Sequence, residues 1–278
     1  IANDQITVAD DGPGMLFNRR SEAYPDLNMV EQYLEYPHFG PSAYAHAPHV
    51  HMRAMGVGLA CVNAASAWLK IKTDNGRQAW SKTYLGFTPQ TAVTSPSSGI
   101  TGTSISLKLE PHIFGRHVPN LRALRSELID QAAQYPGLRV ALNGEIFLSE
   151  NGLLDLAETI HTKQFGPSRN KRKVRLELSH PFVKLQIALI GDAIGVEIQK
   201  SWANGVHTRD GGSHIEGLDQ ALQMFGWRPA VRLIHAIMME PEYAGPTKDT
   251  LHVPQLTPIV RDLVTPEISR FLSNDNGT

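Results

Sequence analysis

Apolar and polar residues alternate along some parts of the chain and recur with helical spacing along others. From 103 to 109 the alternation has period two, with Ile105, Leu107 and Leu109 on one face, which predicts a half-buried strand. Between 121 and 132 apolar residues recur at i, i+3, i+7, i+8 and i+11, the spacing of an amphipathic helix. A turn at Asp74-Asn75-Gly76 predicts a hairpin over 69–84. The chain therefore mixes strands with helices.

The same patterns predict elements on both sides of Asn143-Gly144. Before this point we expect strands at 6–8 and 138–142, a helix at 57–68, and a short helix at 28–36 within a long loop from 16 to 52. After it we expect helices at 153–161, 218–225 and 258–272, and strands at 174–178, 183–189, 195–199 and 230–238. Because each half combines both kinds of element, the sequence predicts two α+β domains, over 1–143 and 144–278.

Composition narrows the class of protein. With 278 residues, 41% of them hydrophobic and 19% charged, the chain is long and apolar enough to bury a core. The formal net charge of −1 supplies no overall positive field for nucleic acid. No apolar run reaches the roughly 18 residues of a membrane helix, so no membrane association is expected. The single cysteine, Cys61, excludes an internal disulfide, fits a reducing cytoplasm and is expected to be buried.

Three glycine-containing segments stand at turns or helix starts. Asp10-Asp11-Gly12-Pro13-Gly14 follows the first strand, where a carboxylate can accept a hydrogen bond from adenine while glycines let the ring approach the backbone. Both aspartates also suit an ordinary turn. Gly56-Val57-Gly58 opens an apolar helix, and free amides at a helix start suit a phosphate. The run from Thr208 to Gly217 offers free amides to an anion, or is simply a strand-turn-helix junction.

In this order, and with Gly102-Thr103 and Pro246-Thr247-Lys248, these segments resemble one family over nearly the whole chain. The family is the ATPase region of type II DNA topoisomerases, represented by the DNA gyrase B subunit and its topoisomerase IV counterpart. The resemblance implies an α+β architecture. A Bergerat-type (GHKL) ATP-binding α/β sandwich is expected over 1–143, and a transducer domain with a left-handed βαβ crossover over 144–278.

The resemblance also implies which residues bind the nucleotide. Asp10 would contact adenine, and Gly14 with the adjacent Met15 would lie against the ring. Thr103 would supply a hydroxyl beside Asp10, although a strand threonine also serves packing alone. The phosphates would bind at the helix start, at Gly56, Val57 and Gly58. Lys248 would contact the γ-phosphate as a point charge, and it is the one catalytic residue that the resemblance implies.

The chain departs from the family pattern at several of these positions. Pro13 stands where relatives usually carry arginine, and Pro246 stands where they carry glutamine. Two glycines and a histidine of the phosphate loop are replaced within Met52-Arg53-Ala54-Met55. These changes keep a second interpretation open, in which the protein is a divergent paralogue, a weak or inactive ATPase that acts as an interaction module.

The resemblance implies ATP and Mg²⁺ as cofactors, and coupling of ATP binding and hydrolysis to DNA strand passage. It further implies a cytoplasmic enzyme that forms a homodimer through the ATPase region, pairs with a gyrase A-like subunit, and meets DNA through the intact topoisomerase. The family places a Glu-x-x-x-Asn helix ahead of the Asp-Asp-Gly turn. Only nine residues precede Asp10, so the chain as given is expected not to hydrolyse ATP alone.

Two further clusters of residues carry open interpretations. His38, His46, His49 and His51 are irregularly spaced and lack a cysteine partner, so we assign no metal site to the chain's own residues. The basic run from Arg169 to Arg175 could contact DNA phosphates, or could be a solvated edge that discourages strand pairing.

Overall fold

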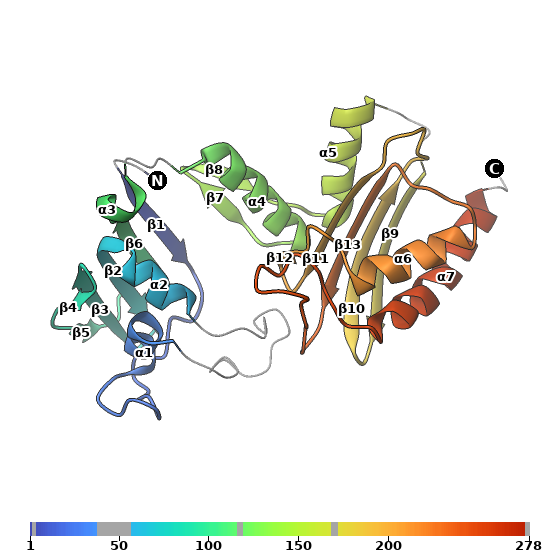
Figure 1. The fold of residues 1–278 in the computed structure, drawn as a ribbon. Helices are drawn as coiled ribbons and strands as arrows, with labels where there is room; N and C mark the ends of the chain where they lie inside the picture. The colour runs from blue at the N-terminus through green and yellow to red at the C-terminus, as the bar shows by residue number, and fades with distance from the viewer. Residues whose placement is uncertain (2–3, 38–56, 116–118, 168–171, 276–278) are drawn as a thin grey trace. The chain divides into compact units, whose positions relative to one another are not determined.

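A computed structural model describes residues 1, 4–37, 57–115, 119–167 and 172–275, and its contacts divide the chain into two compact units (Figure 1). The first unit ends at Asn120 and the second begins at Leu121. Helix α4 (Leu121–Gln134), which the sequence places in the first domain, belongs to the second unit. Ala133 of α4 is buried with Leu153 and Leu156 of the following helix, and this packing explains the position of the division.

The first unit is an antiparallel sheet with strand order β1-β6-β2-β3-β4, and β5 also pairs with β3. Helices α1 and α2 pack against it, and alternate residues of β2, such as Leu69 and Ile71, meet Val30 and Leu34 of α1 in the core. The elements are β1 Gln5–Asp10, α1 Met29–Glu35, α2 Gly58–Ala64, β2 Ser66–Asp74, β3 Gln78–Leu85, β4 Thr88–Pro89, β5 Val93–Pro96, β6 Gly102–Leu109 and α3 Pro111–Phe114.

A nearly buried ion network fixes α1 on the sheet. The Nζ of Lys82 on β3 lies 2.7 Å from Glu31 Oε1 and 3.2 Å from Glu35 Oε1, both on α1. The hydroxyl of Tyr84 donates to Glu35 Oε1 over 2.8 Å, and burial together with this carboxylate raises the pKa of Tyr84. Glu31 also closes a capping box with Asn28, so the same side chain starts the helix and anchors it.

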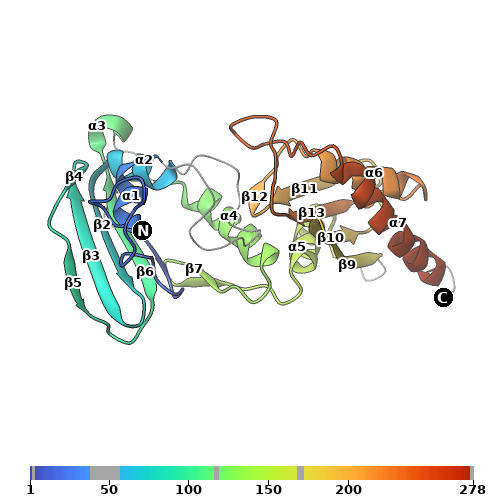
Figure 2. The same cartoon turned by 90° about the horizontal axis from the view of Figure 1, so that it is seen from below.

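The second unit is a sheet of order β12-β11-β13-β10-β9 between two helical layers. Helices α6 and α7 lie side by side on one face in both views (Figures 1 and 2), and α5 lies on the other with α4. Strands β11 and β13 are parallel and joined through α6. The elements are α4, β7 Val140–Leu142, β8 Glu145–Phe147, α5 Leu153–Phe165, β9 Lys173–His180, β10 Val183–Ile190, β11 Ile198–Ala203, β12 Val206–His207, α6 Ser213–Gln223, β13 Val231–Ile237 and α7 Leu256–Asp275.

The central strand β10 shows why both faces of this sheet are covered. Leu185, Ile187 and Leu189 point into the core shared with α6 and α7, while Ala188 and Ile190 point into the core shared with α5. A strand buried on both sides is a continuous apolar run, as residues 187–190 of β10 are, whereas Lys184 and Gln186 still alternate with apolar residues in the first half of the strand.

Three predictions about local structure are wrong. The helix predicted over 57–68 ends at Ala64, because Ser66 to Trp68 already pair with β6 and begin β2. The strand predicted at 195–199 is β11 and begins at Ile198, since Gly195 has a φ of +96° that extended backbone does not adopt. Cys61 is exposed, because the short helix α2 turns Ala60 and Asn63 inward instead.

Candidate functional site

Asp10 ends β1 directly opposite Thr103 of β6. Its Oδ1 accepts hydrogen bonds from Gly12 N over 2.9 Å and from Thr103 N over 3.3 Å. Both bonds fall on one carboxylate oxygen of an exposed side chain. The carboxylate is thereby oriented by the backbone, while Oδ2 is the oxygen turned away from these bonds.

Thr73 of β2 joins Thr103 and Met15 to the same cluster. It is the register partner of Thr103, and the two hydroxyls lie 3.1 Å apart. Met15 N donates to Thr73 Oγ1 over 2.7 Å, which ties the chain after Gly14 to the middle of the sheet. Sequence reasoning missed Thr73, because its position beside Thr103 depends on the pairing of β2 with β6.

Gly14 is required where it stands. It has a φ of +77°, and a Cβ there would lie 2.3 Å from the carbonyl oxygen of Asp74. The Asp74 carboxylate accepts from Ser97 Oγ over 2.6 Å, from Gly76 N over 2.9 Å and from Ser98 N over 3.0 Å. These bonds, led by the Ser97 hydroxyl, lower the pKa of Asp74 to about 2. The turn that carries Asp10 therefore packs against Asp74, whose ionised carboxylate is held in place by these hydrogen bonds.

The helix start predicted to bind phosphate is only partly described. Gly56 lies outside the described residues, as do Arg53 and the histidines at 38, 46, 49 and 51. Val57 is the N-cap of α2 and supplies no side-chain hydrogen bond to the helix start. Gly58, the first helical residue, is exposed, and a Cβ there would meet nothing within 4 Å.

Lys248 lies in the second unit, in the turn of a hairpin-like loop. The two sides of this loop are joined by bonds from His252 N to Glu242 O, at 2.7 Å, and from Ala244 N to Thr250 O, at 3.1 Å. Its tip runs from Gly245 to Asp249, and Lys248 N closes a turn onto Gly245 O over 3.1 Å.

The Lys248 side chain is half-buried and lies on an aromatic ring. Its Nζ is 5.8 Å from the ring centroid of Tyr243, within the range of a cation–π contact. Burial lowers the pKa of Lys248 below its ordinary value. The backbone φ of +61° is uncommon for a residue with a side chain, so surrounding contacts hold this conformation.

Several backbone amides in the run from Thr208 to Gly217 already have partners within the protein. Asp210 N donates to Asp249 O, Ser213 N donates to Leu251 O, and Glu216 N donates to Gly212 O, at 2.9, 2.9 and 3.0 Å. The prediction of an anion-binding site is therefore wrong for these three amides. Two of them bond to the loop that follows Lys248, and the third bonds within the first turn of α6.

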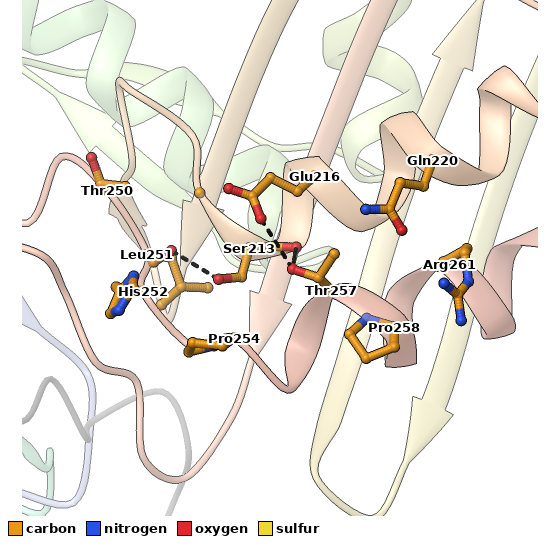
Figure 3. A pocket seen from close by; sticks show the side chains of 11 residues that line it. Ser213, Glu216, Gln220, Thr250, Leu251, His252, Pro254, Thr257, Pro258 and Arg261 are labelled. Carbon is orange, nitrogen blue, oxygen red and sulfur yellow. Dashed lines mark hydrogen bonds between the residues drawn. The ribbon is translucent and has the colours of Figure 1, made fainter.

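Side-chain hydroxyls complete this connection, as Figure 3 shows from close by. Ser213 Oγ accepts from Val253 N over 3.0 Å and donates to Leu251 O over 3.4 Å. Thr257 at the start of α7 donates to Ser213 O over 3.1 Å and to Glu216 over 3.2 Å. A pocket of about 510 Å³ lies beside these groups and is lined by none of the predicted site residues.

Among the described residues, no group of three histidine, cysteine or acidic side chains is placed to hold a metal ion. In the same part of the chain no helix is both long and apolar enough to cross a membrane. The described residues of the basic run are paired with acids: Arg172 with Asp192, Lys173 with Glu158, and Arg175 with Glu177. They lie at or beside β9, an edge strand, which favours the edge interpretation.

Comparison with known proteins gives relatives along nearly the whole chain. The DNA gyrase B protein of Clostridium acetobutylicum is 25% identical over 98% of this chain and 47% of its own length. The DNA topoisomerase 4 B protein of Rickettsia prowazekii is 24% identical over 97% of this chain and 46% of its own. The chain thus spans about half the length of these curated relatives. No family model matches the sequence.

Solved structures agree with the sequence comparison. The 43K ATPase domain of Thermus thermophilus gyrase B superimposes with a TM-score of 0.71 at 20% identity, covering 98% of this chain and 77% of that domain. The chain has the fold of a type II topoisomerase ATPase region. The resemblance predicted from the motifs is confirmed, and so is the predicted α+β fold.

Within this ATPase-region fold, four predicted nucleotide residues come together in the first unit. Asp10, Met15 and Thr103 share one hydrogen-bond network through Thr73, and Gly14 directly precedes Met15. Val57 and Gly58 stand at the start of α2, and Lys248 stands in the second unit. Their roles in binding remain predictions.

Proposed function

We propose that the first unit binds ATP and that the second unit responds to its γ-phosphate through Lys248. On this proposal the chain is the ATPase and transducer region of a type II DNA topoisomerase, where ATP binding and hydrolysis are coupled to DNA strand passage. The proposal rests on one observation above the others, which is the arrangement of Asp10.

Asp10 has the geometry that recognition of an adenine amine needs. Backbone amides of Gly12 and Thr103 hold Oδ1, so the side chain is oriented before any ligand arrives. Oδ2 of this exposed carboxylate can accept a hydrogen bond from the exocyclic amine, which only donates at its hydrogens. Gly14 allows the backbone to approach Asp74 closely and presents no side chain to a flat ring.

The phosphates are proposed to bind at the start of α2, near Val57 and Gly58. The backbone amides of a first helical turn point toward an anion, and no side chain caps these groups here. Lys248 would add a positive charge at the third phosphate. Mg²⁺ would be held largely by phosphate oxygens and water, as is usual for this ion, and we assign it no ligand from the described residues.

The intact protein is proposed to act with further partners. These are a second copy bound through the ATPase region, a gyrase A-like subunit and DNA, in the cytoplasm. The relatives that suggest this assembly are about twice as long as the chain, so each of these partners is part of the proposal.

Calorimetry with a non-hydrolysable ATP analogue tests the adenine contact. Asp10→Ala should weaken binding by about 1.5 to 3 kcal/mol, because a hydrogen bond to a charged acceptor is lost. Asp11→Ala is the matched control: Asp11 is the neighbouring exposed acid, and its removal should leave affinity within about 0.5 kcal/mol. Equal losses for the two variants, or no loss in a folded Asp10→Ala protein, would contradict the assignment.

A second measurement tests Lys248. Lys248→Ala should lower the affinity for the triphosphate analogue while leaving ADP affinity unchanged, since only the triphosphate offers a γ-phosphate to the ammonium. Equal losses for both nucleotides would show that Lys248 does not distinguish them.

The second candidate function is that of an interaction module with weak or no nucleotide binding. Pro13 and Pro246 in place of a donor side chain favour it, since proline offers no hydrogen bond to a ligand. Under this function the unaltered chain would show no heat of binding with either nucleotide in the same calorimetric experiment.

A further inference from the structure

The contact between Lys248 and Tyr243 lies within the second unit and involves no nucleotide. The Nζ of Lys248 stands 5.8 Å from the ring centroid of Tyr243. Both residues belong to the loop between β13 and α7, so this contact is made within one loop. Lys248, whose proposed partner is the γ-phosphate, therefore contacts the ring of Tyr243 in this structure.

Tyr243 is itself fixed in place. Its hydroxyl donates to Ala203 O at the end of β11 over 3.2 Å, and burial raises the pKa of this hydroxyl to about 12, so it stays a donor. The ring packs against the core of the second unit, and Tyr243 is bridged to Leu251 across the loop. The ring is thus a rigid surface on which the ammonium can be held.

The loop is anchored on its other side by the Thr208–Gly217 segment. Asp249, next to Lys248, accepts from Asp210 N over 2.9 Å, and Leu251 N donates to Gly211 O over 3.0 Å. With both sides of the loop fixed, the freedom left to Lys248 is mainly that of its own side chain. Movement of the ammonium between two partners therefore does not require the loop to unfold.

We propose that Tyr243 is a specificity-determining residue: its ring holds the Lys248 ammonium when no γ-phosphate is present, and the γ-phosphate competes with the ring for it. This inference rests on the proposed function of Lys248. A diphosphate does not reach the lysine and leaves it on Tyr243. A triphosphate must displace it, so the affinity for triphosphate is lowered by the strength of the cation–π contact.

Two variants of Tyr243 separate the ring from the hydroxyl. Tyr243→Leu removes the ring but keeps an apolar side chain against the core. Tyr243→Phe removes the hydrogen bond to Ala203 and keeps the ring. A cation–π contact at a partly exposed site corresponds to about a two- to fivefold change in affinity. Tyr243→Leu should therefore raise the affinity for the triphosphate analogue by about this factor and leave ADP affinity unchanged, and Tyr243→Phe should change neither.

A spectroscopic measurement follows the lysine directly. In chain labelled with carbon-13 lysine, the ε-methylene signal of Lys248, identified by its loss in Lys248→Ala, should be shifted upfield by the ring. The shift should persist in Tyr243→Phe, vanish in Tyr243→Leu, and disappear when the triphosphate analogue is added but not when ADP is added.

The outcomes distinguish this inference from the proposed function. If the triphosphate analogue binds and Lys248→Ala weakens it, but Tyr243→Leu alters neither the lysine signal nor the affinity ratio, the inference fails and the proposed function stands. The inference is also overturned if Tyr243→Leu lowers triphosphate affinity, or if Tyr243→Phe behaves like Tyr243→Leu. If the unaltered chain binds neither nucleotide, the proposed function and the inference fall together.

Discussion

The turn from Asp10 to Gly14 in the first unit and the junction from Thr208 to Gly217 in the second use the same residue types differently. Both contain a glycine that no other residue could replace without strain: a Cβ at Gly14 would lie 2.3 Å from a carbonyl oxygen, and one at Gly212 would lie 2.1 Å from another. Both follow a strand. Glycine by itself therefore does not distinguish a ligand site from a structural junction.

The difference lies in where the polar atoms are used. In the junction the amides of Asp210, Ser213 and Glu216 all bond to backbone carbonyls, and the Ser213 hydroxyl bonds on both sides. In the turn, the hydrogen bonds of the exposed Asp10 side chain fall on one oxygen. In the candidate binding site, Oδ2 of Asp10 is oriented and turned away from the bonds on Oδ1. In the junction, these polar atoms are bonded to other groups of the protein.

Lowering the pH should produce the largest difference in stability between the two regions. Burial lowers the pKa of His214, in the junction, and of His235, on β13, to about 3, whereas the Asp74 support of the turn has a pKa of about 2. The unfolded state binds the extra protons, so the stabilisation from each histidine is complete above pH 6.5 and is lost as the pH falls toward 3. The loss is up to about 1.4 kcal/mol per pH unit for each histidine.

Asp74 instead loses its contribution only between pH 3.8 and about 2. Hydrogen exchange resolved by segment should thus show β13 losing protection at a higher pH than β6. His214→Gln should reduce the pH dependence in the second unit by about half. Simultaneous loss of protection in both units would contradict the difference between them.

Gly212→Ala should be the most damaging single substitution in the junction. The residue has a φ of +120°, and the added Cβ would strike the backbone of Leu251, so we expect a loss on the order of 3 kcal/mol in the free energy of unfolding. Gly226→Ala is the control, because Gly226 has a φ of +62° but open space around it, and should cost about 1 kcal/mol. Urea unfolding measures both, and equal losses would mean that the close approach to Leu251 is not what requires glycine.

Ser213→Ala should cost about 1 to 3 kcal/mol of stability, because the buried amide of Val253 loses its acceptor. Ser273→Ala removes an exposed hydroxyl bonded to Ser269 O and should stay within about 0.5 kcal/mol. Thermal unfolding of the two variants compares them. A Ser213→Ala protein as stable as Ser273→Ala would show that the hydroxyl does not connect the junction to the loop.

Gly58→Ala should have the smallest effect on stability. A Cβ at this first residue of α2 meets nothing within 4 Å, and alanine favours a helix by up to about 1 kcal/mol over glycine. If the start of α2 binds phosphate, the same substitution should lower the affinity for the ATP analogue several-fold without destabilising the chain. Unchanged affinity would move the proposed phosphate site away from Gly58.

Much of the fold could be predicted from local pattern. The alternation at β6, the apolar run at the end of β10 and the Asp74-Asn75-Gly76 turn between β2 and β3 each require only neighbouring residues. Other features depend on residues that are distant in the sequence, and the local pattern of apolar residues did not predict them. The end of α2 is decided by pairing of Ser66 with Leu109 on β6, and the place of α4 in the second unit by its packing against α5.

Some residues of the candidate site could likewise be found from the sequence, and others only from the structure. The order of the motifs was sufficient to bring Asp10, Gly14 and Thr103 to attention, because carboxylate, glycine and hydroxyl chemistry can be read from residue type alone. Thr73 could not be found from residue type, because a threonine in a strand has no distinguishing pattern. Only the strand register shows that its hydroxyl oxygen lies 3.1 Å from that of Thr103. Nor could the sequence tell that the amides of Asp210 and Ser213 are bonded to carbonyls of Asp249 and Leu251, about forty positions away.

Sequence alone therefore determined the two-part α+β fold, the family resemblance and the residue types available for chemistry. Tertiary structure decided which of those groups remain open to a ligand. Hydrogen bonds between residues far apart in the chain have no local signature, yet they occupy the Ser213 hydroxyl in the junction and orient the exposed carboxylate of Asp10. The contact of Lys248 with the ring of Tyr243 likewise forms only in the folded loop.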